Sequence, residues 1–234
     1  MPVGRTAIWR YMRYEYFAQM LREGRLYFAS AREFADPFEG ALPVLDARRR
    51  REIERGVDRD VSRAFEELRR LHKVSCWHMN RGESAAMWDL YLRDGKGIAI
   101  RTTISRLKNA LQPYRIQPDY GIEDFWMGAV RYIDYRTQAL RGDGFYGPFF
   151  HNRRSFAHER EFRVLVSLRM AEEFGVHVPE FGIKVDVDTS KLVQAIYLAP
   201  QTTAAFRHRV EALVAGAGLN APIHQSELDD VAVY

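Results

Sequence analysis

Apolar runs of strand length alternate with segments of helical periodicity along most of this chain. The strand-like runs lie near residues 8–12, 26–30, 73–78, 97–102 and 160–168. Such an alternation packs helices on one or two sheets, so it predicts an α+β fold whose strands are mixed and mostly antiparallel. Because no repeat, low-complexity tract or Pro/Gly-rich linker divides the sequence, we expect a single domain over residues 1–234.

The composition excludes several classes of protein. Apolar residues make up 47% of the chain and aromatic residues 13%, which is enough for a core and incompatible with disorder. No apolar run approaches the ~20 residues of a membrane-spanning helix, and the first residues lack the apolar stretch of a signal peptide. The single cysteine, Cys76, excludes an internal disulfide and a cysteine-based zinc site. We expect a cytoplasmic protein without a membrane partner.

Basic residues exceed acidic residues by 35 to 31, and four arginines run together from Arg48 to Arg51. One interpretation is a patch that binds phosphate or nucleic acid. The other is the solvated face of a long charged helix over about residues 46–71, in which both signs of charge alternate. The interleaved glutamates favour the helix face, and nucleic-acid binding stays open as the alternative.

The segment SFAHEREFR places Glu159 and Glu161 at alternate positions before the apolar run VLVSL. On a strand, alternate residues share a face, so we expect Glu159, Glu161 and Arg163 to point one way and Phe162 and Val164 to face the core. An unpaired buried carboxylate would cost several kcal/mol. The charged face is therefore either open to solvent or a polar cleft in which Arg163 is the internal partner.

Further candidates are isolated residues, because the chain has no Gly-rich phosphate loop, HExxH, GxSxG or paired-cysteine motif. His78 ends a strand-like run and suits acid–base chemistry, although a lone histidine is more often structural. Asp36 and Glu39 flank Pro37 in the loop FADPFEG, where they either form a turn or line a pocket. Trp88 lies in helical phase with Met87 and Tyr91, which predicts that Trp88 is buried.

Four blocks, LYFASAREFADPFEG, SCWHMNRGESAAMWDLYLRDGKGIAIRTT, RRSFAHEREFR and IYLAP, occur in this order along the chain. In sequence and spacing they resemble the bacterial family known as domain of unknown function 2971, from about Ile8 to Tyr234. Family members often carry a lysine at the position of Asn152. If that lysine binds a ligand, Arg153 or Arg154 would replace it here, or the contact is lost. This resemblance implies a fold grouping and no activity.

A second likeness concerns the layout of these segments. A strand with a basic residue, a helix, the block GRLYFASAREFADPF and a late Glu-x-Glu strand look like the plan of ADP-ribosyltransferases. The likeness implies a split sheet that binds NAD in a cleft. An arginine or histidine of the first strand would hold the NAD, an aromatic ring would stack on nicotinamide, and the late glutamate would stabilise the transition state. The chain lacks the Ser-Thr-Ser triplet and the His-x-Thr motif, so this is analogy at the level of fold.

Under this likeness Arg10 would hold the NAD, Tyr27 or Phe34 would stack on nicotinamide, and Glu161 would stabilise the transition state. The candidate catalytic residues are Glu161, Arg10 and His78. The candidate residues for binding NAD are Tyr27, Phe34, Asp36, Glu159 and Arg163. NAD would be a substrate, and no metal is indicated.

Three functions stay open. The preferred one is an NAD-dependent ADP-ribosyltransferase or NAD glycohydrolase that acts in phage defence or toxicity. The second is a non-catalytic module that binds a nucleotide or nucleic acid through its arginines. The third is a metal-dependent nuclease that uses Asp36, Glu39, His78 and Glu161. The sequence names neither the acceptor nor the oligomeric state.

Overall fold

The computed structural model describes residues 2–53, 61–92, 96–140 and 146–232, without the side chains of residues 50–53, 61 and 62. Its contacts divide the chain into two compact units. The first unit comprises Met1–Tyr27, Trp77–Pro113 and Lys184–Tyr234, and the second comprises Phe28–Cys76 and Tyr114–Ile183. The strands β2 (Arg25–Ser30), β3 (His72–Met79) and β9 (Ile183–Asp186) contribute residues to both units. The expectation of one domain over residues 1–234 stays a prediction.

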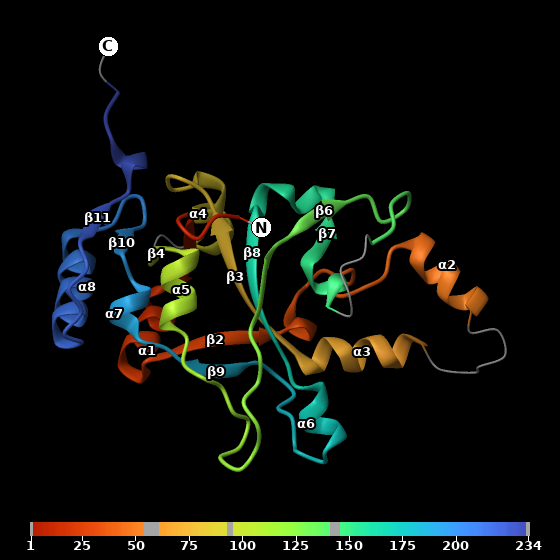
Figure 1. Cartoon of the computed structure of the whole chain (residues 1–234). Helices are drawn as coiled ribbons and strands as arrows, with labels where there is room; N and C mark the ends of the chain where they lie inside the picture. Colours follow the sequence, from red (N-terminus) through yellow and green to blue (C-terminus); the bar gives the residue numbers. More distant parts are fainter. Residues whose placement is uncertain (1, 54–60, 93–95, 141–145, 233–234) are drawn as a thin grey trace. The chain divides into compact units, whose positions relative to one another are not determined.

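The first unit contains four neighbouring strands (Figure 1). In sheet order they are β11 (Ile223–Gln225), β10 (Ala195–Leu198), β4 (Gly97–Thr103) and β1 (Ala7–Arg13). The β1–β4 and β4–β10 pairs are antiparallel, and β10–β11 is parallel. The helices of this unit are α1 (Tyr14–Glu23), α4 (Ala85–Tyr91), α5 (Ile104–Ala110), α7 (Thr189–Leu192), α8 (Ala204–Gly216) and the 3-10 turn η4 (Glu227–Asp229).

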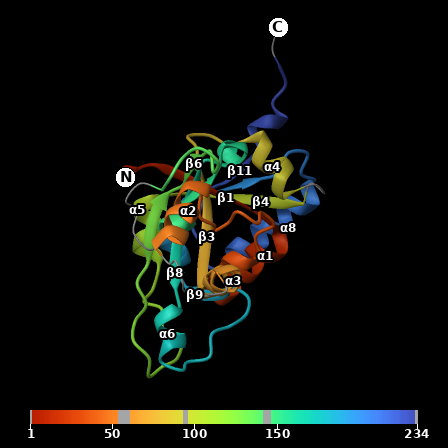
Figure 2. The same ribbon diagram turned by 90° about the vertical axis from the view of Figure 1, so that its right-hand side faces the viewer.

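The second unit is built on β8 (Glu161–Ser167), which pairs antiparallel with β5 (Trp126–Ala129). Strand β8 also pairs with β3, and the two lie side by side in both views (Figures 1 and 2). The parallel strands β6 (Arg131–Ile133) and β7 (His151–Arg153) form a separate pair. The helices are α2 (Val44–Ile53), α3 (Val61–Leu71), α6 (Arg169–Glu173) and the 3-10 turns η1 (Ala31–Glu33), η2 (Gly147–Phe150) and η3 (Arg154–Glu159).

These elements confirm the α+β class with largely antiparallel strands, and each of the five predicted strand segments is a strand. Local sequence explains several boundaries. Helix α1 ends at Gly24, whose φ of 62° is left-handed and whose N–H donates to the Met20 carbonyl over 3.0 Å. Glycine adopts this conformation without a Cβ penalty, so it is a favourable residue for ending a helix. No helix within the described ranges is long and apolar enough to cross a membrane.

The predicted charged helix corresponds to two helices, α2 and α3, and the connecting residues 54–60 lie outside the described part. Arg48 and Arg49 are exposed on α2, whereas the side chains of Arg50 and Arg51 are not described. On α3, Arg69 and Arg70 pair with glutamates three residues earlier, as expected for a helix face with charges of both signs. The exposure of Arg48 and Arg49 agrees with both interpretations of the run.

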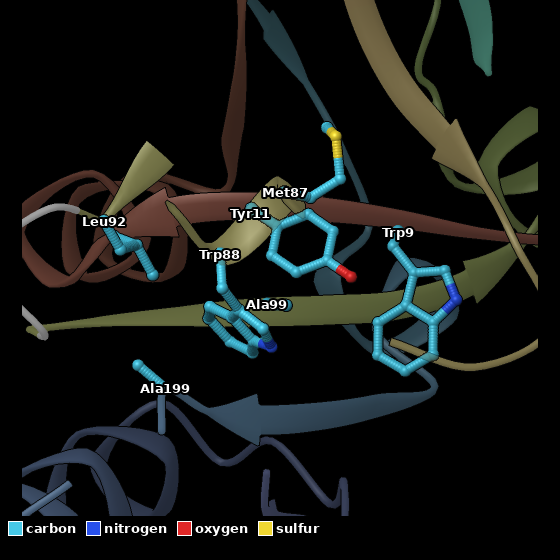
Figure 3. Close-up of a cluster of buried hydrophobic side chains, with 7 residues drawn as sticks. All are labelled: Trp9, Tyr11, Met87, Trp88, Leu92, Ala99 and Ala199. Carbon is cyan, nitrogen blue, oxygen red and sulfur yellow. The ribbon is translucent and has the colours of Figure 1, made fainter. Parts of the chain in front are cut away.

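Trp88 lies in a buried aromatic cluster of the first unit (Figure 3). Its side chain is 3% exposed, and its ring meets the Tyr11 ring edge-on at 4.8 Å. The Trp88 Nε1–H donates to Glu83 Oε2 over 2.6 Å, so the one polar group of the indole is satisfied. The predicted burial of Trp88 is confirmed, whereas Tyr91 on the same helix is 44% exposed.

We expect Trp88→Ala to lower the free energy of unfolding by about 3–5 kcal/mol, because it removes a large buried ring and leaves a cavity. Tyr91→Ala on the same helix is the matched control and should cost much less. Urea unfolding followed by circular dichroism measures both variants. Equal stability of Trp88→Ala and the wild type would contradict this account of the core.

Candidate functional site

Strand β8 is buried on both faces from its first residue. Phe162 and Val164 face the core as expected, but Glu161 is only 7% exposed and Arg163 only 1%. The expectation of a solvent-exposed charged face is therefore wrong. Of the alternative, the internal pairing with Arg163 is confirmed, and ion pairing compensates for the burial of these charges. A cleft over this face stays a prediction.

Arg163 binds two carboxylates at once. Its Nη1 and Nη2 donate to the two carboxylate oxygens of Glu39 over 2.5 and 3.0 Å, and its Nε donates to Glu161 Oε2 over 2.5 Å. Nη1 also donates to the Phe149 carbonyl over 2.7 Å. We call Glu39, Arg163 and Glu161 the ionic triad; its formal charge is −1.

The pKa directions follow from this arrangement. Burial alone would lower the pKa of Arg163, but the charges of Glu161 and Glu39 raise it well above its usual value. Burial raises the pKa of Glu39, and the charge and hydrogen bonds of Arg163 oppose that rise. The guanidinium therefore stays charged, and Glu39 depends on it as a buried partner.

Glu159 does not lie on the strand, contrary to the expectation. It ends the turn η3, and Arg160 follows with a left-handed φ of 43°, so the alternation of β8 begins only at Glu161. Glu159 is half-buried, and burial followed by the negative charge of Glu161 raises its pKa to about 7. Glu161 is thus paired with a guanidinium, whereas the pKa of Glu159 lies close to neutral pH.

A second arginine lies at the edge of this cluster. Arg153 Nη2 and Nε donate to the two oxygens of Asp36 over 2.7 and 3.2 Å, and its guanidinium lies 4.6 Å from the Phe38 ring centre. Asp36 also contributes to the raised pKa of Glu159. Arg163 lies 5.7 Å from the Phe34 ring centre. The second unit thus brings together five candidates, Phe34, Asp36, Glu159, Glu161 and Arg163.

The other three candidates belong to the first unit. Arg10 Nη2 donates to the Tyr27 carbonyl over 3.0 Å, and the Tyr27 side chain is 40% exposed. His78 is 3% exposed, lies opposite Trp9 in the β1–β3 ladder and meets the Tyr11 ring at 6.2 Å. Convergence of Arg10, Tyr27 and His78 on one cleft with the other five candidates stays a prediction.

Glu39 was not predicted as a catalytic or NAD-binding residue, although it is the bidentate partner of Arg163. The one signal was its position in the loop FADPFEG, which also fits an ordinary turn. Gly40 adds a physical reason for that loop: its φ is 71°, and a Cβ there would lie 2.6 Å from the Phe149 ring. The loop therefore packs tightly against Phe149 at Gly40, the residue next to Glu39.

Among the residues that the structure describes, no group of three or more His, Cys, Asp or Glu side chains is arranged to hold a metal ion. Three carboxylates predicted for a metal-dependent nuclease form ion pairs with arginines in this structure. Asp36 pairs with Arg153, and Glu39 and Glu161 pair with Arg163.

Comparisons with known proteins give a fold likeness only. No family model and no curated protein matches this chain, so the relation to domain of unknown function 2971 stays a resemblance. DarT from Thermus sp. 2.9 in complex with NAD+ aligns over 99% of this chain and 100% of its own, with 9% identity and a TM-score of 0.46. The same protein with ADP-ribosylated ssDNA aligns over 97% and 96%, with 12% identity and a TM-score of 0.44. At these values the likeness carries no conclusion about activity.

We expect Arg163→Met to lower the free energy of unfolding by about 3–5 kcal/mol at neutral pH, because two buried carboxylates lose their partner. Acid should recover part of this loss, since burial raises the pKa of Glu39 and its protonation removes an uncompensated charge. The measurement is urea unfolding at pH 7.5 and pH 5. Arg169→Met, which breaks the exposed pair with Glu173, is the control and should cost about 0–1 kcal/mol. A similar small loss for Arg163→Met would contradict the ionic triad.

Proposed function

We propose that this chain cleaves the bond between ribose and nicotinamide in NAD and transfers ADP-ribose to an acceptor or to water. It would act as an ADP-ribosyltransferase or an NAD glycohydrolase. The observation that carries the proposal is Glu161, a carboxylate fixed by Arg163 at the start of a buried strand.

The chemistry needs a fixed negative charge. As the carbon–nitrogen bond breaks, the electron pair leaves with nicotinamide, and positive charge develops on the sugar carbon. A preorganised carboxylate stabilises that charge without reorganising during the reaction. The ionic triad suits this task, because its formal charge of −1 leaves one negative charge uncompensated before the substrate arrives.

Glu159 supplies the second function that the reaction requires. The acceptor, an alcohol, a nitrogen group or water, must lose a proton as it attacks the sugar carbon. A carboxyl group whose pKa is about 7 can take up that proton at neutral pH. Two carboxyl groups in different environments, one ion-paired and one half-buried, support this division of roles.

Two residues of the first unit keep the roles in NAD binding that the sequence predicts for them. Arg10 would bind the negative phosphates of NAD, and the exposed ring of Tyr27 would stack on a base or on nicotinamide. In cells, loss of NAD or modification of an acceptor would stop growth. We therefore place the chain in phage defence or toxicity.

Glu161→Gln should lower nicotinamide release from NAD by at least about 10²-fold, because the amide keeps the shape and loses the charge. The fold should persist, since Arg163 retains both hydrogen bonds to Glu39. The measurement is nicotinamide release by purified protein, with and without cell extract as the source of an acceptor, alongside melting temperature.

Glu173→Gln, at an exposed ion pair, is the matched control and should leave release unchanged. A wild-type protein that releases no nicotinamide with any extract would contradict the proposal. Binding of a nucleotide or nucleic acid by such an inactive protein would instead support the binding-module function.

The pH dependence of release tests Glu159. A general base acts only when deprotonated, so the logarithm of kcat should rise with pH up to about 7 and level off above it. Glu159→Gln should be slower and should lose this rise, because the amide does not titrate. If the variant keeps the same rise around pH 7, another group is the base.

A further inference from the structure

We infer that Glu39 is a positioning residue, which holds Arg163 so that Arg163 fixes the carboxylate of Glu161 for the reaction. This inference rests on the proposed function and deepens it, because it assigns a role in the reaction to a residue outside the predicted site. Glu39 itself does not touch the substrate in this account.

The hydrogen bonds of the guanidinium carry the inference. Glu39 occupies Nη1 and Nη2 together, and the Phe149 carbonyl takes a second bond from Nη1. A planar guanidinium bound on this side is fixed in position and orientation. Its Nε is left to donate to Glu161, and it does so over 2.5 Å.

The contact at Glu161 leaves one oxygen for substrate. Arg163 reaches only Oε2, and no donor among the described residues reaches Oε1. The side chain of Glu161 is 9% exposed, against 2% for Glu39 and 1% for Arg163, so it is the open member of the ionic triad. A positive charge developing on the sugar carbon would therefore interact with Glu161 and be screened from Glu39.

The loop around Glu39 is itself held in place. The Glu39 N–H donates to the Asp36 carbonyl over 3.1 Å, and the Phe38 N–H donates to Asp36 Oδ1 over 3.1 Å. Arg153 binds the same Asp36 carboxylate from outside the loop. The position of Glu39, and through it that of Glu161, is thus set by several contacts of neighbouring residues.

A purely structural role makes a different prediction from a positioning role. If Glu39 only stabilises the fold, its loss lowers the melting temperature and acts on activity independently of Glu161. If Glu39 acts through Glu161, its loss slows the reaction only while the Glu161 carboxylate is present. A double-mutant cycle separates the two cases.

The cycle compares wild type, Glu39→Gln, Glu161→Gln and the double variant, with Glu173→Gln as the matched control. For each full-length protein, kcat and KM for NAD are measured by nicotinamide release, and the melting temperature is recorded. We expect Glu39→Gln to lower kcat by roughly 10²-fold, the cost of a small misplacement of a reacting group, with little change in KM. The double variant should be no slower than Glu161→Gln alone.

Arg163→Lys covers the case in which Glu39→Gln does not fold. Lysine keeps the positive charge but cannot bind two carboxylates in fork geometry, so kcat should fall as it does for Glu39→Gln. If the losses in kcat multiply in the double variant, the positioning role of Glu39 is wrong while the proposed function stands. A wild-type kcat in Arg163→Lys would have the same meaning. An inactive wild type would overturn the proposed function and this inference with it.

Discussion

The buried guanidinium of Arg163 is the constraint on which the second unit depends. A guanidinium that is 1% exposed is tolerable only with charged partners and satisfied hydrogen bonds, and Glu39, Glu161 and the Phe149 carbonyl provide them. Glu161 lies on the same strand as Arg163, whereas Phe149 lies in a 3-10 turn 14 residues away and Glu39 in a loop 124 residues away. One side chain therefore ties three segments of the second unit together and at the same time places the carboxylate of Glu161.

Much of the fold was predictable from the sequence, because it depends on interactions between residues that are close in the chain. The run VLVSL after Glu161 is strand β8, apolar residues at helical spacing form α1 and α4, and Gly24 ends α1 in the left-handed conformation. Each of these features depends on neighbours within a few positions. Period, capping and backbone preference act over that distance, so the sequence alone is enough.

The site was less predictable, because its contacts are long-range. The rule that charged residues face water failed at Arg163, since its bidentate partner Glu39 lies 124 residues away. Glu161 is buried beside Arg163 as its second carboxylate partner. The strand alternation failed at Glu159, because Arg160 adopts a left-handed conformation that is uncommon for a residue other than glycine. The role of Glu39 could not be inferred from a loop motif that equally describes a turn.

In the proposed reaction, two carboxyl groups with different surroundings take different roles. Glu161 is held by a guanidinium and offers a fixed negative charge, whereas Glu159 has a pKa of about 7 and can exchange a proton. This division comes from burial and pairing, and the residue type is the same at both positions. The first unit adds Arg10 and Tyr27 as predicted contacts for NAD.

The most direct test of the central claim is the secondary kinetic isotope effect on nicotinamide release from NAD that carries deuterium at the C1′ carbon of the nicotinamide ribose. If Glu161 stabilises positive charge on that carbon, the carbon flattens in the transition state, and the account predicts slower release from deuterated NAD in a competition between the two substrates. Equal release from labelled and unlabelled NAD, or no release at all, would contradict it.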